Sequence, residues 1–249
     1  MLFKLEGTNN LMKEILIAQY KKLPFDLRSR LHHVYDATNG NRALIALVSP
    51  IRQKRTIRKI SRLKSPRRLV VGESNPVDGW FTSNYQVLAK NFLDITKEFA
   101  DSGSISNIYA DNVIEHLELD SAHLFMQNAF HSLLPGGSIR LVTPDCLAMA
   151  NAYIQKDLQK VKQVATDLKQ HGLKIDEPID LLHVTFAAFG HYSGRIYDED
   201  TLTSLLLNAG FSSVERFPTS KSNNPVFQNL EKRVGDSLDW SQLCLEARK

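Results

Sequence analysis

The sequence predicts an α/β fold in which helices flank a mostly parallel sheet, and three observations predict it. Short apolar runs alternate with longer stretches of helical periodicity, as expected where helices connect parallel strands. Proline and glycine mark most of the boundaries between these segments. The chain has 249 residues, 43% of them hydrophobic and 23% charged, which suits one α/β domain with an extension.

The first part of the chain, residues 1–66, is predicted to be a helical basic extension. Residues 1–50 have the pattern of short helices, with breaks at Pro24 and at 39–41 and with Pro50 closing the segment. Ile57, Ile60 and Leu63 are then spaced for one face of a further helix, which Ser65-Pro66 ends.

Residues 67–249 are predicted to form the second unit, an α/β domain. Apolar runs predict strands at 69–71, 80–83, 91–95, 105–109, 138–143, 211–217 and 241–247. Helices are expected at 121–134 and 147–169, and a third begins at Asp198 and ends at 208–210. The stretch 135–137, Pro-Gly-Gly, ends the first of these helices. A linker at 172–178 and a less regular aromatic segment at 182–197 separate the other two.

The charge is unevenly distributed along the chain. Residues 1–68 hold 16 Lys and Arg against 4 Asp and Glu, a net charge of +12, and the remainder has a net charge of −8. Nine of the basic residues lie between positions 51 and 68. Such a segment fits a nucleic acid, an anionic lipid or a phosphorylated glycan as its partner, or simply a solvated helix face.

The sequence also excludes several classes of protein. The longest apolar run, 43–48, is far shorter than the roughly 20 residues of a membrane span. No secretory signal is recognised, and two cysteines are too few for a disulfide framework or a cysteine metal site. We therefore expect a cytoplasmic protein without a bound metal.

Polar residues follow several of the predicted strands. Ligands of such sheets bind outside the carboxyl ends of the strands, where the strand order reverses. The residues at these ends are Gly72-Glu73-Ser74, Asn84, Asp94-Ile95, Asp111-Asn112 and 143–145. A glycine at the first strand end lets a ligand approach the backbone closely. This set predicts a crevice for a polar, adenosine-like ligand.

The order of these segments resembles a known family. Gly72 is followed by Gly79-Trp80, and then come Val113-Ile114-Glu115-His116, 133–137 (Leu-Leu-Pro-Gly-Gly), 209–211 (Ala-Gly-Phe) and the closing run 245–249. From residue 67 to 249 the chain is similar to class I S-adenosylmethionine-dependent methyltransferases. More narrowly, it resembles the stand-alone methyltransferases of bacterial surface-polysaccharide synthesis. The resemblance implies a Rossmann-like, seven-stranded, mostly parallel sheet with helices on both faces and an antiparallel last strand pair.

The resemblance also implies a cofactor and an acceptor. S-adenosylmethionine is expected to contact Gly72, Glu73, Ser74, Asn84, Asp94, Ile95, Asp111 and Asn112, and the acceptor is expected to be a glycan or glycolipid hydroxyl. Three positions depart from the family pattern: Ser74 replaces a glycine, Asn84 an acidic residue and Asn112 a histidine. Because a carboxylate makes stronger hydrogen bonds than an amide, Asn84 implies weakened cofactor binding.

His116 is the candidate catalytic base, since an imidazole with an ordinary pKa near 6.5 can take a proton from a hydroxyl. A structural role for the same histidine stays open. The segment with His183, His191, Tyr192 and Tyr197 is where resembling enzymes build their acceptor pocket.

Two other functions stay open at this stage. The three departures fit a catalytically inactive scaffold or binding protein with the same fold. A nicotinamide-dependent dehydrogenase is disfavoured, because the full glycine fingerprint is absent after the first strand. Residues 51–68 carry no aromatic side chain that could stack on bases. We therefore expect them to bind an anionic membrane surface, at the inner face of the membrane, rather than nucleic acid.

Overall fold

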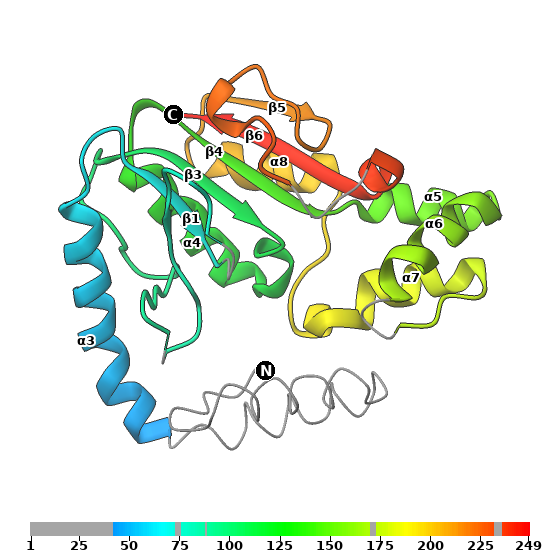
Figure 1. Ribbon diagram of the computed structural model, residues 1–249, viewed down its shortest axis with the longest axis horizontal. Helices are drawn as coiled ribbons and strands as arrows, with labels where there is room; N and C mark the ends of the chain where they lie inside the picture. The colour runs from blue at the N-terminus through cyan, green and yellow to red at the C-terminus, as the bar shows by residue number, and fades with distance from the viewer. Residues whose placement is uncertain (1–41, 73–75, 88, 170–172, 232–235) are drawn as a thin grey trace.

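A six-stranded sheet of order β2-β1-β3-β4-β6-β5 is the centre of the fold (Figure 1). The computed structural model describes residues 42–72, 76–87, 89–169, 173–231 and 236–249. The strands are β1 (Arg68–Val71), β2 (Phe81–Thr82), β3 (Ile105–Asp111), β4 (Leu133–Pro144), β5 (Ser213–Phe217) and β6 (Gln242–Arg248). Helices α3 (Arg42–Ser61), α4 (Leu119–Ser132) and α8 (Glu199–Asn208) pack around it. The predicted α/β class is confirmed.

The first four strands of the sheet run parallel, and the last strand lies antiparallel between two of its neighbours. Val71 of β1 pairs with Ala110 of β3, and Ala110 pairs with Leu141 of β4, so these strands end side by side. Strand β6 is antiparallel to both β4 and β5. The antiparallel last strand pair was predicted correctly.

Within the described residues the sheet has six strands, one fewer than the seven that were predicted. The segment 91–95, which was expected to be a strand, makes one isolated bridge, between Asn84 and Phe92. Beyond it the backbone of Asp94 pairs with a side chain: Gln53 Nε2 donates to the Asp94 carbonyl at 3.1 Å, and the Asp94 N–H donates to Gln53 Oε1 at 2.8 Å. An amide from α3 thus takes the hydrogen bonds that a neighbouring strand would have made.

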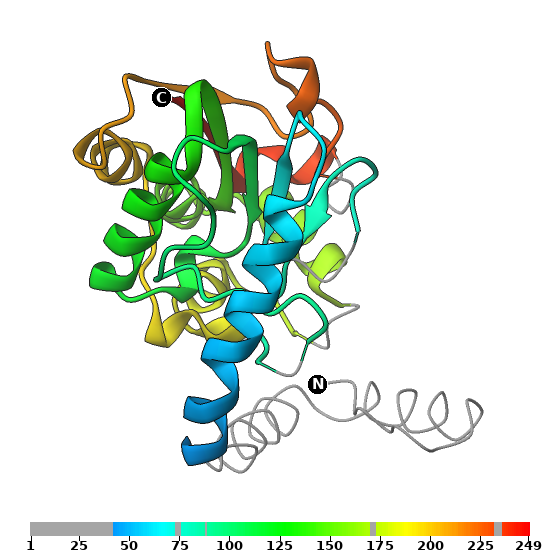
Figure 2. The same cartoon turned by 90° about the vertical axis from the view of Figure 1, so that its left-hand side faces the viewer.

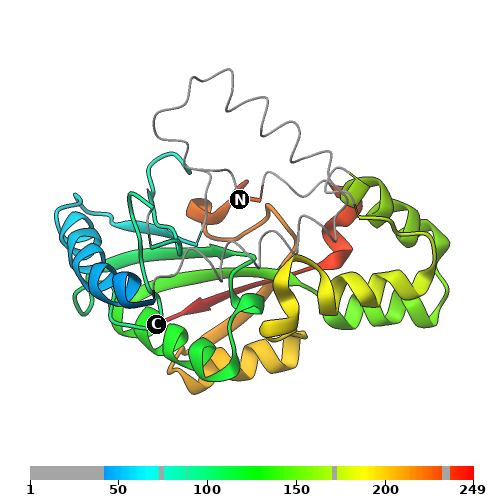
Figure 3. The same cartoon turned by 90° about the horizontal axis from the view of Figure 1, so that it is seen from below.

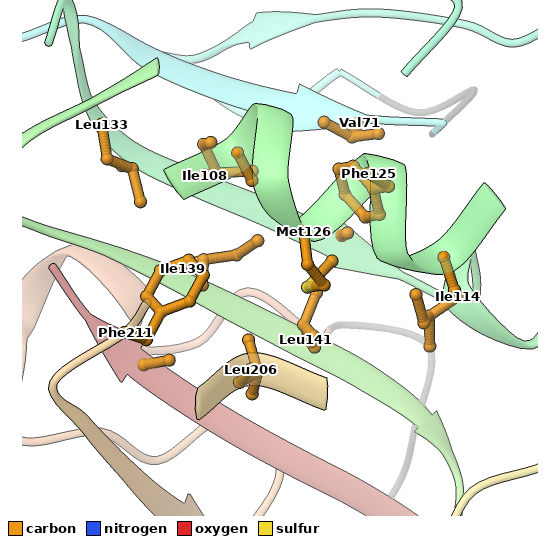
Figure 4. Packing of buried hydrophobic residues seen from close by; sticks show 14 of the residues in the cluster. Val71, Ile108, Ile114, Phe125, Met126, Leu133, Ile139, Leu141, Leu206 and Phe211 are labelled. Atoms are coloured by element: carbon orange, nitrogen blue, oxygen red, sulfur yellow. The ribbon is translucent and has the colours of Figure 1, made fainter. Parts of the chain in front are cut away.

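Helices α4 and α8 cover one face of the sheet, and the main core lies beneath them (Figures 3 and 4). On the opposite face Val70, Tyr109, Val142 and Cys244 pack against loop residues, including Trp80. The short turn η4 (Pro225–Phe227) adds Phe227, whose ring centroid lies 6.0 Å from that of Trp80. In the described part of the chain, loops and a 3₁₀ turn cover this face. The prediction that helices cover both faces of the sheet is therefore wrong for the described residues.

Helix α3 packs along the edge of the sheet (Figure 2). It runs through Pro50, although that residue was predicted to close a helix. Beyond Pro50, Gln53, Thr56 and Ile60 are buried along one face, and this packing offsets the hydrogen bond that proline cannot make. The earlier breaks, at Pro24 and 39–41, lie outside the described residues. The proposed division at residues 66 and 67 stays a prediction.

The outer face of α3 and the turn after it is basic. Lys54, Arg55, Arg58, Arg62 and Lys64 are exposed. Other cations of the segment are engaged by the protein: Lys59 Nζ, for example, donates to Asn91 Oδ1 at 2.8 Å. Among the described helices, none is both long and apolar enough to cross a bilayer.

Three helices form a smaller cluster beyond the end of β4, with its own core: α5 (Cys146–Ile154), α6 (Leu158–Leu168) and α7 (Pro178–Ala187). The single helix predicted over 147–169 is divided, because Lys156 adopts a φ of 51° and Asp157 starts a new helix. The Asp157 carboxylate accepts from the N–H groups of Gln159 and Lys160, which caps α6.

The segment 182–197 is also more regular than predicted. Its first part belongs to α7, which begins with Pro178 in the first turn, where the missing N–H costs nothing. The Asp180 carboxylate accepts from the Glu177 N–H at 2.9 Å and closes the helix start. The short helix η3 (Ala188–Ser193) follows and leads back toward the sheet.

Candidate functional site

The strand order reverses between β1 and β3. The chain proceeds from β1 to β2 on one side and from β3 to β4 on the other, which is the arrangement that opens a crevice at the carboxyl ends of the strands. Gly72 follows β1, and Asp111 and Asn112 stand at the end of β3 beside it. Asn84 lies just past β2. Glu73 and Ser74 fall outside the described residues.

Gly72 occupies a position that a side chain would not fit. Its φ is +73°, and an added Cβ would lie 2.8 Å from Val113 Cγ2. A glycine is therefore required both by the left-handed backbone and by the close approach of Val113. The first strand thus ends at a glycine against which Val113 packs, and the approach of a ligand to its backbone stays a prediction.

The end of β3 offers an unused hydrogen-bond acceptor. Asp111 is 8% exposed, and the Tyr109 hydroxyl donates to its Oδ2 at 3.1 Å. Asn112 has a φ of 50°, and its N–H donates to the Val142 carbonyl. The Asn112 Oδ1 atom is buried and has no hydrogen-bond partner within the described residues. A buried acceptor without a donor is uncommon and suits a ligand that brings one.

Asn84 and Asp94 are both engaged by their own loops. Asn84 Oδ1 accepts from the Gln86 N–H at 2.8 Å. Asp94 Oδ1 accepts from the Thr96 hydroxyl at 2.6 Å, and Lys97 Nζ lies 2.9 Å from Asp94 Oδ2. Burial works to raise the pKa of Asp94, but the bonds from Thr96 and Lys97 outweigh it, so the pKa is lowered. Asp94 Oδ1 also accepts from the Thr96 N–H, so the acceptor capacity left for a ligand lies on Asn84 Oδ1 and Asp94 Oδ2.

Ile95 lies less favourably for a ligand. Its side chain is partly buried and packs against the main core, and its carbonyl accepts from Asn128 Nδ2 at 3.1 Å. The structure places Ile95 beside Asp94 and assigns its side chain to the core. A cofactor contact of Ile95 stays a prediction.

His116 belongs to a cluster that the sequence did not predict. It ends the short helix η1 (Ile114–His116), and its ring centroid lies 5.1 Å from that of His191 in η3. Glu115 is 1% exposed, and its Oε2 accepts from the Thr143 hydroxyl at 3.1 Å. Glu115 and His191 were each noticed in the sequence, but nothing in its local pattern showed that they meet.

The pKa of each histidine of this cluster is lowered. Burial of the ring, together with the neighbouring His191, lowers the pKa of His116 to about 4, although part of that side chain reaches the surface. Burial also lowers the pKa of His191, although a hydrogen bond with the Thr185 carbonyl works to raise it. The role of His116 as a catalytic base stays a prediction.

The expected acceptor segment is only partly brought to this site. His183 is exposed on α7, and the Tyr192 side chain lies outside the described residues. Tyr197 is 1% exposed, and its hydroxyl has no hydrogen-bond partner within the described part of the chain. Burial raises the pKa of Tyr197 to about 12. Among the described side chains of this segment, the structure places His191 against His116.

Comparisons with known proteins give distant likenesses. No family model and no curated protein matches the chain. Among solved structures, a SAM-dependent methyltransferase from Thermotoga maritima has a TM-score of 0.42 at 10% identity, over 86% of this chain and 96% of that one. A second, from Mesorhizobium loti, has a TM-score of 0.38 at 16% identity, covering 74% and 81% of the two chains.

The phosphoethanolamine N-methyltransferase 2 of Haemonchus contortus, solved with S-adenosylhomocysteine, matches with a TM-score of 0.41 at 10% identity, over 79% of this chain and 52% of that one. All three proteins are methyltransferases by name. With TM-scores below 0.5 these likenesses carry no weight for activity, so the function is inferred from this chain's own residues.

Proposed function

We propose that the chain is an S-adenosylmethionine-dependent methyltransferase. The observation that carries the proposal is the reversal of strand order between β1 and β3, where Gly72 follows the first strand and Asp111 and Asn112 stand at the end of the next. The order of motifs from residue 67 to 249 supports it. A dinucleotide cofactor fits less well, because Asn84 supplies no carboxylate after the second strand.

The residues at the crevice fit such a cofactor. The buried Asn112 Oδ1 provides an acceptor that the described protein does not use, and the lack of a side chain at Gly72 would let a ligand approach its backbone on the side away from Val113. Asn84 and Asp94 would add acceptors on the side of β2. When bound, S-adenosylmethionine supplies an electrophilic methyl group. Contacts from Glu73 and Ser74 belong to the same proposal.

The chain's own contribution would be mainly to position the reactants. Methyl transfer is an in-line displacement, and holding two reactants in line lowers the barrier strongly without a strong base. Asn112 would fix the cofactor at the end of β3, and Gly72 would keep the backbone clear. The acceptor, a glycan or glycolipid hydroxyl, is proposed from the motif resemblance alone.

Cofactor binding is tested by calorimetric titration of S-adenosylmethionine and S-adenosylhomocysteine into the full chain. We expect both to bind, and Asn84→Asp to tighten binding about five-fold, because a charged acceptor gains about 1 kcal/mol over a neutral one. The aspartate can still accept from the Gln86 N–H, so the loop should hold. Asn224→Asp, which caps η4, is the matched control and should leave affinity unchanged.

Gly72→Ala gives a second test. Binding should fall, whereas Gly103→Ala, also at positive φ but with open space around an added Cβ, should bind normally. Pairing Gly72→Ala with Val113→Ala removes the clash but not the strain of the left-handed backbone, so it should recover only part of the lost stability. If millimolar cofactor produces neither heat nor a thermal shift, the enzyme proposal fails and an inactive scaffold of the same fold replaces it.

We also propose that the basic outer face of α3, defined by Lys54, Arg55, Arg58, Arg62 and Lys64, binds an anionic membrane surface. Each of these side chains is exposed, and a Lys or Arg near anionic lipid contributes about 1 kcal/mol. Because α3 packs on the sheet, binding through this face would hold the whole described domain at the membrane, where glycolipid acceptors are found.

A further inference from the structure

Three side chains with metal-binding atoms converge beyond the end of β3. Glu115, His116 and His191 each offer one ligand atom, and these atoms all lie within 4.8 Å of one another. Glu115 and His191 are buried, at 1% and 5% exposure, whereas His116 is exposed. Solvent therefore reaches the cluster from the side of His116.

The tautomer of His191 is determined by its surroundings. Its Nδ1 lies 3.0 Å from the Thr185 carbonyl oxygen, which can only accept, so Nδ1 carries the proton. The lone pair is then on Nε2. This atom is buried and has no hydrogen-bond partner among the described residues. A histidine whose second nitrogen is anchored to a backbone carbonyl is the usual form of a metal ligand.

The carboxylate of the cluster is held in a similar way. Thr143 at the end of β4 donates its hydroxyl to Glu115 Oε2. The Glu115 backbone is fixed as well, because the Arg195 N–H donates to its carbonyl at 3.1 Å. A Cβ on Gly194 would collide with that carbonyl oxygen, so a glycine is required for η3 to approach η1 this closely. Two distant segments are thus locked together around the three ligands.

We propose that Glu115, His116 and His191 bind a divalent transition-metal ion, with Zn²⁺ the best match. Two imidazoles and one carboxylate are a typical ligand set of zinc sites, and Mg²⁺ and Ca²⁺ prefer sites made of oxygen alone. Three protein ligands leave one position of a tetrahedral ion open, as in catalytic zinc sites. None of the three ligands is among the residues proposed to hold the cofactor, and the site makes His116 a ligand in place of a base.

The test uses the tag-free full chain, stripped with EDTA and titrated calorimetrically with Zn²⁺, and with Mg²⁺ for comparison. We expect one Zn²⁺ per chain and no measurable heat with Mg²⁺. His191→Ala should weaken Zn²⁺ binding by about 100-fold or more. Thr143→Val, which removes a partner of a ligand, should weaken it by about 10–100-fold. His183→Ala, an exposed histidine on α7, is the control and should bind as the parent does.

Co²⁺ provides a readout that does not depend on heat. Bound through these ligands in a tetrahedral site, it should give visible d–d absorption bands, which His191→Ala removes and His183→Ala retains. Circular dichroism and thermal melts show whether each variant is folded. If His191→Ala does not fold, Thr143→Val takes its place as the variant in which Zn²⁺ binding is measured. Absence of stoichiometric Zn²⁺ binding overturns the proposal, and so does binding that neither His191→Ala nor Thr143→Val weakens.

Discussion

Replacing Arg140 with methionine should destabilise the fold by about 3–5 kcal/mol, because it leaves buried carboxylates without their cation. Arg140 lies on β4 and is 0% exposed. Its guanidinium makes a bidentate pair with Glu231, at 2.8 and 3.0 Å, and a third bond to Glu246 at 2.6 Å. The carbonyls of Pro218 and Lys221 accept two more bonds, so all five N–H donors are used.

The magnitude follows from what the substitution leaves behind. Methionine fills much of the space, so the loss of packing is small. The Glu231 side chain, at 0% exposure, then has no opposite charge beside it, and Glu246, at 11%, keeps the hydroxyl of Ser222. Since a domain of this kind is stable by about 5–15 kcal/mol, such a loss is a large part of the total.

Equilibrium unfolding in urea, followed by circular dichroism, measures the effect. Combining Arg140→Met with Glu231→Leu should cost less than Arg140→Met alone, because no unpaired carboxylate then remains at that position. Lys97→Met, which breaks a pair whose lysine side chain is 64% exposed, should cost less than about 1 kcal/mol. A loss below 1 kcal/mol for Arg140→Met, or strictly additive single effects, would refute the reasoning.

Three further predictions concern other parts of the chain. Burial raises the pKa of Glu246 above its ordinary 4.5, so its contribution to stability is full below that pH and is lost as pH rises through the raised value. The unfolding free energy should therefore fall less between pH 4.5 and pH 7 in Glu246→Gln than in the parent. The same dependence of unfolding free energy on pH in both proteins would contradict this. Cys244 is buried, and burial raises its pKa to about 12. A thiol reagent should therefore modify the half-buried Cys146 first in the native protein. Labelling is followed by mass spectrometry, and equal rates at the two cysteines would contradict this. Replacing Arg55, Arg58 and Arg62 with Glu reverses their charge and should abolish co-sedimentation with anionic vesicles at low salt. The control Lys162→Glu, on α6, should sediment as the parent does. Equal sedimentation of the parent and the triple variant would remove the membrane proposal.

Much of the candidate crevice could be predicted from sequence. Gly72, Asp111 and Asn112 directly follow the apolar runs that became β1 and β3, and parallel strands end at a common edge. Asn84 and Asp94 follow from the same rule, although the strand expected at 91–95 did not form, and their contacts with a cofactor stay predictions. The metal-binding cluster could not be found this way. Glu115 and His191 are far apart in the chain, and neither carries a local signal of its partner.

The resemblance of residues 67–249 to a known family implied the antiparallel last pair. The sequence pattern by itself determined the α/β class, five of the strand positions within a few residues, and the start of α8 at Asp198. These features depend on hydrophobic period and on residues such as proline, glycine and aspartate that act on their own backbone. Only the tertiary structure decided that Gln53 takes the place of a strand partner, that α3 passes Pro50, and that η3 reaches Glu115. Arg140 illustrates the physical reason: its carboxylate partners stand 91 and 106 residues away, and contacts at that separation depend on how whole elements pack rather than on any local pattern.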